Sequence, residues 1–241
     1  RISELQSSLG VGGAATVSAS METQRDQLLP LLDVAEEMLM RPTFPADELE
    51  ELKRQQLTAL DESRDDPGAV ASRILGRHFN TYPQDHPNYL PDWEEQAESI
   101  MAVERDQLIS FHQTHYGFGP GSTISFVGDF DPDQLRTELE NRFGQWSSPT
   151  QFVRIDRVHT PIEPVALVSQ MDDKANAVLI GRTTFPMSDD HPDYPAISLA
   201  GHLIGGGFLN SRLAERIRDQ EGLSYGVGGG FGASALDEIA R

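Results

Sequence analysis

Residues 205–231 hold the most restrictive feature of the sequence, because a glycine run, a short helical pattern and a second glycine-rich stretch follow one another without a break. The first run ends one helical pattern. Another pattern begins at Asn210 or Ser211, both residue types that commonly cap a helix N-terminus. Gly222 is a suitable C-terminal stop for it. Glycine weakens a strand, so the glycines of residues 223–231 predict a strand that another backbone approaches closely.

Arg218 and Tyr225 flank the predicted turn between this helix and this strand. Leu209, Leu213 and Ile217 mark the apolar face of the helix. Arginine offers a fork of N–H donors and tyrosine offers a hydroxyl, so the pair is suited to binding a carbonyl or a carboxylate. Taken singly, each residue has an ordinary alternative. Arg218 can be a salt-bridge partner on a helix surface, for instance of Glu221, and Tyr225 can be a half-buried strand residue.

The charge balance is strongly acidic, since 19 Lys and Arg against 38 Asp and Glu give 19 − 38 = −19 at pH 7. This balance excludes the basic footprint of a nucleic-acid-binding protein. The excess of acidic residues fits either a soluble acidic surface or an electrostatic field that attracts basic peptides. The chain has no cysteine, which excludes disulfides, thiol nucleophiles and Cys-ligated metals. No apolar run approaches the length of about 18 residues that predicts a membrane span.

Hydrophobic periodicity predicts paired helices with intervening strands, which is typical of an α+β fold with helices packed on one face of a largely antiparallel sheet. Helices are expected over residues 26–41, 46–62, 69–79, 91–101, 104–116, 132–143 and 194–204. Further strands are expected over residues 123–127, 165–170 and 177–185, and in an alternating stretch that ends near residue 20.

The two ends of the chain resemble each other. Aligning Arg1 with Arg212, an offset of 212 − 1 = 211 residues, also aligns Glu4 with Glu215 and brings two glycine-rich stretches together after a short insertion. We interpret this match as an internal repeat. Residues 1–148 would be the later part of one domain, and residues 149–241 the early part of the next. The chain is therefore expected to be a fragment of a longer protein.

The stretch Gly-Gly-Gly-Phe-Leu-Asn-Ser-Arg-Leu, followed by Arg218, Gly-Leu-Ser and Tyr225, resembles the Arg/Tyr signature of the M16 zinc metallopeptidases, the pitrilysin, insulinase and mitochondrial processing peptidase group. The spacing of the pair, 225 − 218 = 7 residues, agrees with that signature. Other stretches resemble M16 segments in the family's order: residues 41–67, 116–146, 172–181 and 191–207. The resemblance is to the C-terminal, non-catalytic half of a long member or to a non-catalytic partner subunit.

The resemblance implies LuxS/MPP-like α+β domains in tandem, arranged as two halves that close around a chamber. It also implies that Arg218 and Tyr225 lie on the non-catalytic half and hold a peptide beside zinc bound elsewhere. The family's zinc ligands are a His-x-x-Glu-His motif and a distant Glu. The motif is not found in the sequence, and its family position falls upstream of Arg1. The distant Glu aligns near Ala59, whose methyl group cannot bind zinc, although a shifted alignment would bring in Glu62.

Two other patterns have simpler explanations than a site. His112 and His115 are spaced so that they can chelate a metal, but no carboxylate occupies a matching position and packing of an amphipathic helix accounts for both. The glycine run of residues 205–207 lacks the Lys-Ser/Thr that a phosphate-binding P-loop needs, so a turn between helices is the better interpretation. We therefore expect no metal-ligating residue in this chain.

The expected function is the non-catalytic, substrate-binding and chamber-forming half of an M16-type zinc metalloendopeptidase, inactive by itself and without catalytic residues of its own. Its expected partners are a peptide substrate and a zinc-bearing half or subunit, with no nucleic acid and no membrane span. Two alternatives stay open: a structural or assembly subunit of the same fold, and a catalytic half whose zinc motif lies upstream of Arg1. Long bacterial members of the family are often exported, so the periplasm is the expected compartment.

Overall fold

The computed structural model describes residues 2–13, 16–207 and 210–241. The chain divides into two compact units, each formed by two separate stretches of sequence. These are Arg1–Gln56 with Ser99–Val153, and Leu57–Glu98 with Arg154–Arg241. Two of the three divisions fall within helices, α2 (Ala46–Arg64) and α4 (Trp93–Ala102), and the third falls after Val153, outside any helix. The proposed repeat boundary between residues 148 and 149 stays a prediction, and the match of Arg1 to Arg212 begins outside the described residues.

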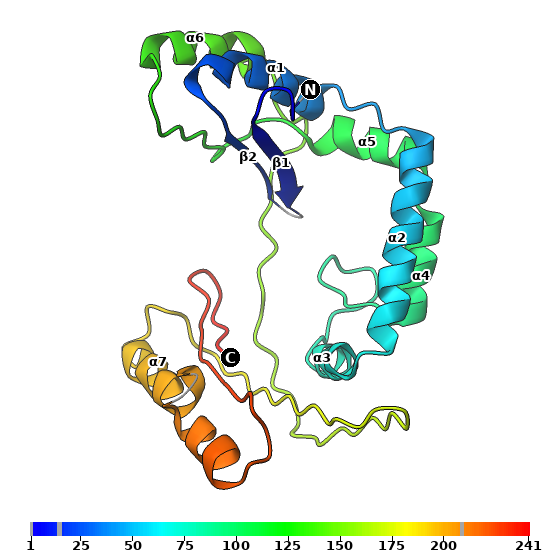
Figure 1. Cartoon of the computed structure of the whole chain (residues 1–241), viewed down its shortest axis with the longest axis vertical. Helices are drawn as coiled ribbons and strands as arrows, with labels where there is room; N and C mark the ends of the chain where they lie inside the picture. Colours follow the sequence, from blue (N-terminus) through cyan, green and yellow to red (C-terminus); the bar gives the residue numbers. More distant parts are fainter. Residues whose placement is uncertain (1, 14–15, 208–209) are drawn as a thin grey trace. The chain divides into compact units, whose positions relative to one another are not determined.

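The first unit contains a two-stranded antiparallel hairpin beside its helices (Figure 1). Strand β1 (Ser8–Gly13) pairs with β2 (Val17–Glu22), so that Ser8 lies opposite Glu22 and Gly13 opposite Val17. The helices are α1 (Leu28–Met40), which follows the 3-10 turn η1 (Arg25–Gln27), together with α5 (Arg105–His115) and α6 (Pro132–Phe143).

The core of the first unit lies between α1 and α6. Leu32 of α1 is fully buried and packs with Leu135 and Phe143 of α6, which are 5% and 6% exposed. Around this cluster pack half-buried apolar side chains from β2, from α1 and from the loop before α6. Arg142 of α6 donates to Asp33 of α1 at 2.8 Å, which links the two helices at the edge of the core.

Each helix expected from the periodicity is present: α6 has the predicted bounds, and the ends of the others are displaced by up to three residues. The second unit contributes α3 (Pro67–His78) and α7 (Tyr194–Gly201). Asp66 and Asp131 cap α3 and α6, because each carboxylate accepts backbone N–H groups of the first turn and a proline follows at the first helical position. None of the described helices combines the length and the apolarity that crossing a bilayer requires.

The loop between α3 and α4 in the second unit is fixed by two arginines of α3. Arg73 donates to the carbonyl of Pro91 at 2.7 Å and lies over the Trp93 ring, 4.0 Å from its centroid. Arg77 donates to the carbonyl of Leu90 at 2.9 Å. These contacts satisfy loop carbonyls that would otherwise lack a partner on this face of the loop.

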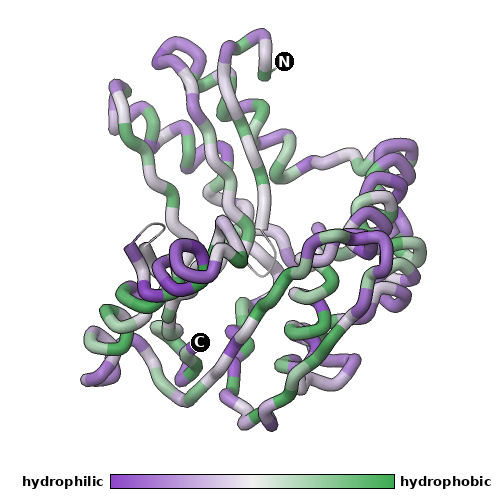
Figure 2. The backbone as a smooth tube through the Cα atoms, turned by 60° about the horizontal axis from the view of Figure 1, so that its bottom comes forward, coloured by the Kyte–Doolittle hydropathy of each residue, from purple (hydrophilic) through white to green (hydrophobic). Residues whose placement is uncertain are grey.

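Four predicted strands are extended but unpaired. Residues 123–127, 165–170, 177–185 and 223–231 form no ladder with any part of the chain that the structure describes, and only isolated bridges such as Phe185 with Ala240 occur. Most of their apolar side chains are consequently exposed. Figure 2 shows hydrophobic stretches of the chain, in green, outside the helices as well as within them. Val127 is 98% exposed, and Val168 and Leu179 are each 93% exposed.

The predicted antiparallel sheet is therefore present in part: β1 and β2 form an antiparallel pair, and the other predicted strands do not join it within the described residues. An alternating pattern specifies which side chains share a face, whereas a ladder also needs a partner strand, which is a neighbour in sequence only in a hairpin such as β1–β2. The observed fold is helix-rich α+β with a small antiparallel sheet.

Candidate functional site

The helical segment that carries Arg218 begins at a buried serine. Ser211 is 1% exposed, and its hydroxyl oxygen accepts from the backbone N–H of Ala214 at 3.2 Å. This contact confirms Ser211, rather than Asn210, as the capping residue. The predicted apolar positions Leu213 and Ile217 are half-buried, whereas Leu209 lies outside the described residues.

Two π-helices surround the glycine run. Helix α7 continues directly into η2 (His202–Gly206), and the segment after Ser211 winds into η3 (Ala214–Gln220). The sequence predicted ordinary helices here, because a 3.6-residue periodicity does not reveal a locally wider turn. π-helical turns are rare and occur frequently at functional sites. The structure thus places Arg218 on an irregular helix.

Arg218 lies near the end of η3, and its side chain is only 17% exposed. Its Nε donates to Oδ1 of Asp219 at 2.7 Å, and one terminal nitrogen donates to Oδ2 at 3.3 Å. This hydrogen bonding raises the pKa of the Arg218 guanidinium and lowers the pKa of the Asp219 carboxyl. Glu221, the partner that the sequence suggested, pairs instead with Arg216 at 2.6 Å.

Tyr225 follows a tight turn after this helix. Gly222 has a φ of 63°, a left-handed conformation that glycine adopts without strain, and its N–H donates to the carbonyl of Arg218 at 3.2 Å. The prediction of a helix stop at Gly222 is therefore confirmed. Tyr225 itself is 79% exposed.

The two predicted site residues lie on either side of the Gly222 turn, with Arg218 near the end of η3 and Tyr225 three residues after Gly222. The pKa of Arg218 is raised first by its hydrogen bond with Asp219 and then by the charge of that carboxylate, with Tyr225 as a smaller contribution. A half-buried guanidinium and an exposed hydroxyl are thus presented at one turn, where both can donate hydrogen bonds to a guest. Their role in substrate binding stays a prediction.

The glycines bring the segment after Tyr225 into backbone contact with η2. A methyl group built on Gly205 would lie 2.5 Å from the backbone nitrogen of Gly229, and the N–H of Gly229 donates to the carbonyl of Gly205 at 3.0 Å. A methyl group on Gly201 would lie 2.8 Å from Cβ of Phe231. The predicted close approach of another backbone is confirmed, although it joins a helix to an extended segment.

Asp237 joins two remote stretches of the second unit, and no motif in the sequence had marked it. Its carboxylate is 8% exposed, accepts from the backbone N–H of Arg157 at 3.0 Å and forms an ion pair with Arg154. The hydrogen bond from Arg157, followed by that from Arg154, holds the pKa of the Asp237 carboxyl below its usual value. Only the folded chain reveals this contact, because residues about 80 positions apart supply it.

The depressed pKa of Asp237 makes its stabilising effect dependent on pH. The contribution is complete above the unfolded-state pKa of about 3.9 and is lost as the pH falls through the lower folded-state value. Asp237→Asn is expected to lower the free energy of unfolding by about 1 kcal/mol at neutral pH. Urea unfolding of both proteins measures this difference, which should shrink in buffers below a pH of about 3.9.

Asp156→Asn is the matched control, because Asp156 also pairs with Arg154 but its side chain is 76% exposed. That change should cost less than about 0.5 kcal/mol. If Asp237→Asn lowers the free energy of unfolding by the same amount in neutral and in strongly acidic buffers, the stabilising role of the Asp237 carboxylate charge is wrong.

The zinc ligands of the M16 signature do not assemble here. Ala59 and Glu62 are both exposed on α2, and the carbonyl of Ala59 accepts from the Ser63 hydroxyl at 2.7 Å. Within residues 2–13, 16–207 and 210–241, no three His, Asp or Glu side chains form a group that could hold a metal ion. The described residues therefore do not fit a zinc site.

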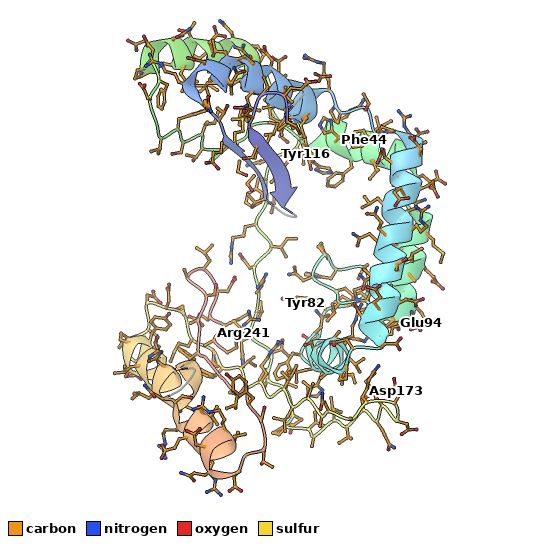
Figure 3. All side chains as sticks on the ribbon, viewed as in Figure 1. Phe44, Tyr82, Glu94, Tyr116, Asp173 and Arg241 are labelled. Atoms are coloured by element: carbon orange, nitrogen blue, oxygen red, sulfur yellow. The ribbon has the colours of Figure 1, made fainter. Side chains whose placement is uncertain are left out.

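His112 and His115 of α5 contact different neighbours. The His112 ring lies between Phe44 and Tyr116, both labelled in Figure 3, with ring centroids 5.8 and 4.7 Å away. His115 instead packs on another aromatic ring of its own helix. The interpretation of this pair as helix packing or surface is confirmed, since His112 is half-buried and packs, whereas His115 is exposed on the surface of α5.

The fold and the Arg/Tyr turn together are those of a domain of the M16 metallopeptidase type. The family described as "peptidase M16 inactive domain" matches residues 102–238, which is more than half of the chain, and the chain belongs to this family. The resemblance stated from the sequence is thereby confirmed.

Known relatives share the sequence at a moderate level. The chain is 28% identical over 226 residues to an uncharacterized zinc protease of Mycobacterium tuberculosis, covering 88% of this chain and 46% of that protein. It is 26% identical over 218 residues to an uncharacterized zinc protease of Mycobacterium leprae, covering 87% of this chain and 45% of that protein. The chain thus spans about half the length of the curated relatives it matches.

Solved structures show the same fold. A crystal structure of a peptidase M16 inactive domain from Pseudomonas fluorescens matches with a TM-score of 0.69 and 24% identity, over 99% of this chain and 57% of that one. A protease from Helicobacter pylori matches with a TM-score of 0.64 and 14% identity, over 99% and 57% of the two chains.

Proposed function

We propose that this chain is the non-catalytic half of an M16-type zinc endopeptidase. It would form one wall of the substrate chamber and bind the peptide through Arg218 and Tyr225. Membership of the inactive-domain family supports a half without catalytic residues. The mycobacterial relatives, which are named zinc proteases, support peptide hydrolysis as the activity of the whole protein.

The arrangement that supports this proposal is the position of Arg218 near the end of η3 and of Tyr225 just after the turn at Gly222. A guanidinium and a phenol can both donate to a peptide carbonyl, which positions the peptide and polarises the carbonyl bond. Neither group is suited to proton transfer, since arginine stays charged and tyrosine, with a pKa of about 10, is a weak base at neutral pH. The pair therefore supports binding, while the zinc that supplies a reactive water would be held by another half.

The rest of the proposal concerns the longer protein. The relatives are about twice the length of this chain, which supports its being a fragment of tandem M16-like domains that pair with a zinc-bearing half. Export to a bacterial periplasm is part of the same proposal.

Arg218→Ala and Tyr225→Phe are each expected to weaken peptide binding by about tenfold, because each removes a donor from the centre of the site. The assay is fluorescence anisotropy with the purified chain and a labelled, mixed-sequence peptide of about 20 residues with neutral and basic side chains. A chelator should leave the binding unchanged, since these residues need no metal.

Matched controls exist on η3 and on α7. Arg216→Ala removes another arginine of η3, one that pairs with Glu221, and Tyr194→Phe removes a hydroxyl from a tyrosine that packs on Phe231. Neither change should alter the affinity. If the folded wild-type chain binds no peptide, the result favours the alternative that the chain is a structural or assembly subunit. Stoichiometric zinc, or hydrolysis that a chelator stops, would favour the catalytic half.

A further inference from the structure

The contact between Arg218 and Asp219 has an unusual geometry for neighbouring residues. Side chains at positions i and i+1 of a helix do not normally face each other. Here both carboxylate oxygens of Asp219 lie against the Nε side of the guanidinium, at 2.7 and 3.3 Å. The carboxylate therefore occupies one of the two edges, the Nε edge, with which Arg218 could bind a guest carboxylate through two parallel hydrogen bonds.

This arrangement changes what the site attracts. Arg218 and Asp219 together carry no net charge, so a guest carboxylate gains little attraction and meets a like charge at close range. A neutral peptide carbonyl brings no such repulsion and needs only a donated hydrogen bond, which an arginine N–H or the Tyr225 hydroxyl can supply. The Arg218 side chain is 17% exposed and that of Asp219 is 50% exposed, so water screens their interactions with a guest in part.

We propose that Asp219 determines the specificity of the Arg218–Tyr225 pair, restricting it to carbonyls of internal peptide bonds and rejecting free C-terminal carboxylates and acidic side chains. This inference rests on the proposed function of the pair as a peptide-binding site. The substrate class it defines is an internal stretch of polypeptide with neutral or basic residues near the bound carbonyl. The net charge of −19 acts in the same direction on peptides that approach the chain.

Two labelled peptides of identical sequence, one ending in an amide and the other in a free carboxylate, test the proposal. Short peptides of about four residues place their C-terminus within reach of the site. The wild-type chain is expected to bind the amide about tenfold more tightly than the free acid. In Asp219→Asn the preference should nearly vanish, because the free acid binds more tightly while the amide is little affected. Asp219→Glu keeps the charge and should retain part of the preference.

Glu221→Gln is the matched control. It removes a carboxylate two residues from Asp219, but Glu221 pairs with Arg216, so the ratio of the two affinities should match that of the wild type. Circular dichroism and the thermal midpoint of each variant establish that it folds like the wild type, so that a change in ratio reports on the site.

The outcomes separate this inference from the proposed function. If Arg218→Ala abolishes binding while Asp219→Asn keeps the wild-type ratio, the role assigned to Asp219 is wrong and the peptide-binding function stands. The same conclusion follows if the wild type binds both peptides equally. If the folded wild type binds neither these peptides nor the longer one, both proposals are wrong.

Discussion

Truncation of Leu32 to alanine should lower the free energy of unfolding by about 3 kcal/mol, the middle of the range for a leucine in a closed core. Leu32 is fully buried between α1 and α6, where Leu135 and Phe143 fill the space around it. The lost free energy has two parts, the burial of the removed methyl groups and the cost of the cavity that they leave. The cavity persists because the packed helices around it cannot move far enough to fill it. Urea unfolding followed by circular dichroism measures the change.

Leu52→Ala provides the comparison for this prediction. Leu52 belongs to α2 and is 51% exposed, so its truncation removes the same atoms from a largely solvated position. The expected loss is below about 1 kcal/mol. Similar losses for the two variants would show that the α1–α6 contact is not the core of the first unit.

Gly205→Ala is expected to destabilise the second unit by about 2 to 3 kcal/mol, at the upper end of the usual cost of overpacking. The new methyl group would lie 2.5 Å from the nitrogen, 2.7 Å from Cα and 2.9 Å from the carbonyl oxygen of Gly229. Because these are backbone atoms, no rotation of a side chain can relieve the clash. The extended segment must then move away from η2, which also breaks the hydrogen bond from Gly229 to Gly205. Thermal and urea unfolding report the loss.

Gly226→Ala is the control within the same segment. A methyl group there would meet nothing within 4 Å, and the residue does not have a left-handed φ. Its stability should stay within about 1 kcal/mol of the wild type, with a small gain because alanine restricts the unfolded chain. If both substitutions lower the stability equally, the close contact of Gly205 with Gly229 is not what destabilises Gly205→Ala.

Local signals in the sequence predicted the helices and their ends well. Asp131 could be identified as a cap because an Asp-Pro pair satisfies first-turn N–H groups with residues adjacent in sequence. Asp66 caps α3 in the same way, although that helix was expected to begin only at residue 69. Gly222 could be identified because a helix stop of this kind needs only one left-handed residue. The glycines of residues 223–231, which include Gly229, were recognisable as points of close backbone approach, although the partner Gly205 was not.

The features that depend on distant or irregular contacts could not be predicted. Residues 165–170 and 177–185 have the composition of strands, but composition does not supply a pairing partner. The pairing of Arg218 with Asp219 depends on the local path of a π-helix, and a regular helix favours partners three or four residues away. Asp237 could not be identified from the sequence because its partners Arg154 and Arg157 lie about 80 residues earlier.

The exposed apolar stretches have a consequence for how the chain behaves in solution. Residues 165–168 and 177–180 are uncharged runs of mostly β-branched or aliphatic side chains without proline, and their backbone edges can template the addition of a second molecule. Mutual repulsion between molecules of charge −19 is then the main force that keeps the solution colloidally stable. Concentrated salt screens that repulsion and acid removes it, so mildly alkaline buffers of low ionic strength suit this chain best.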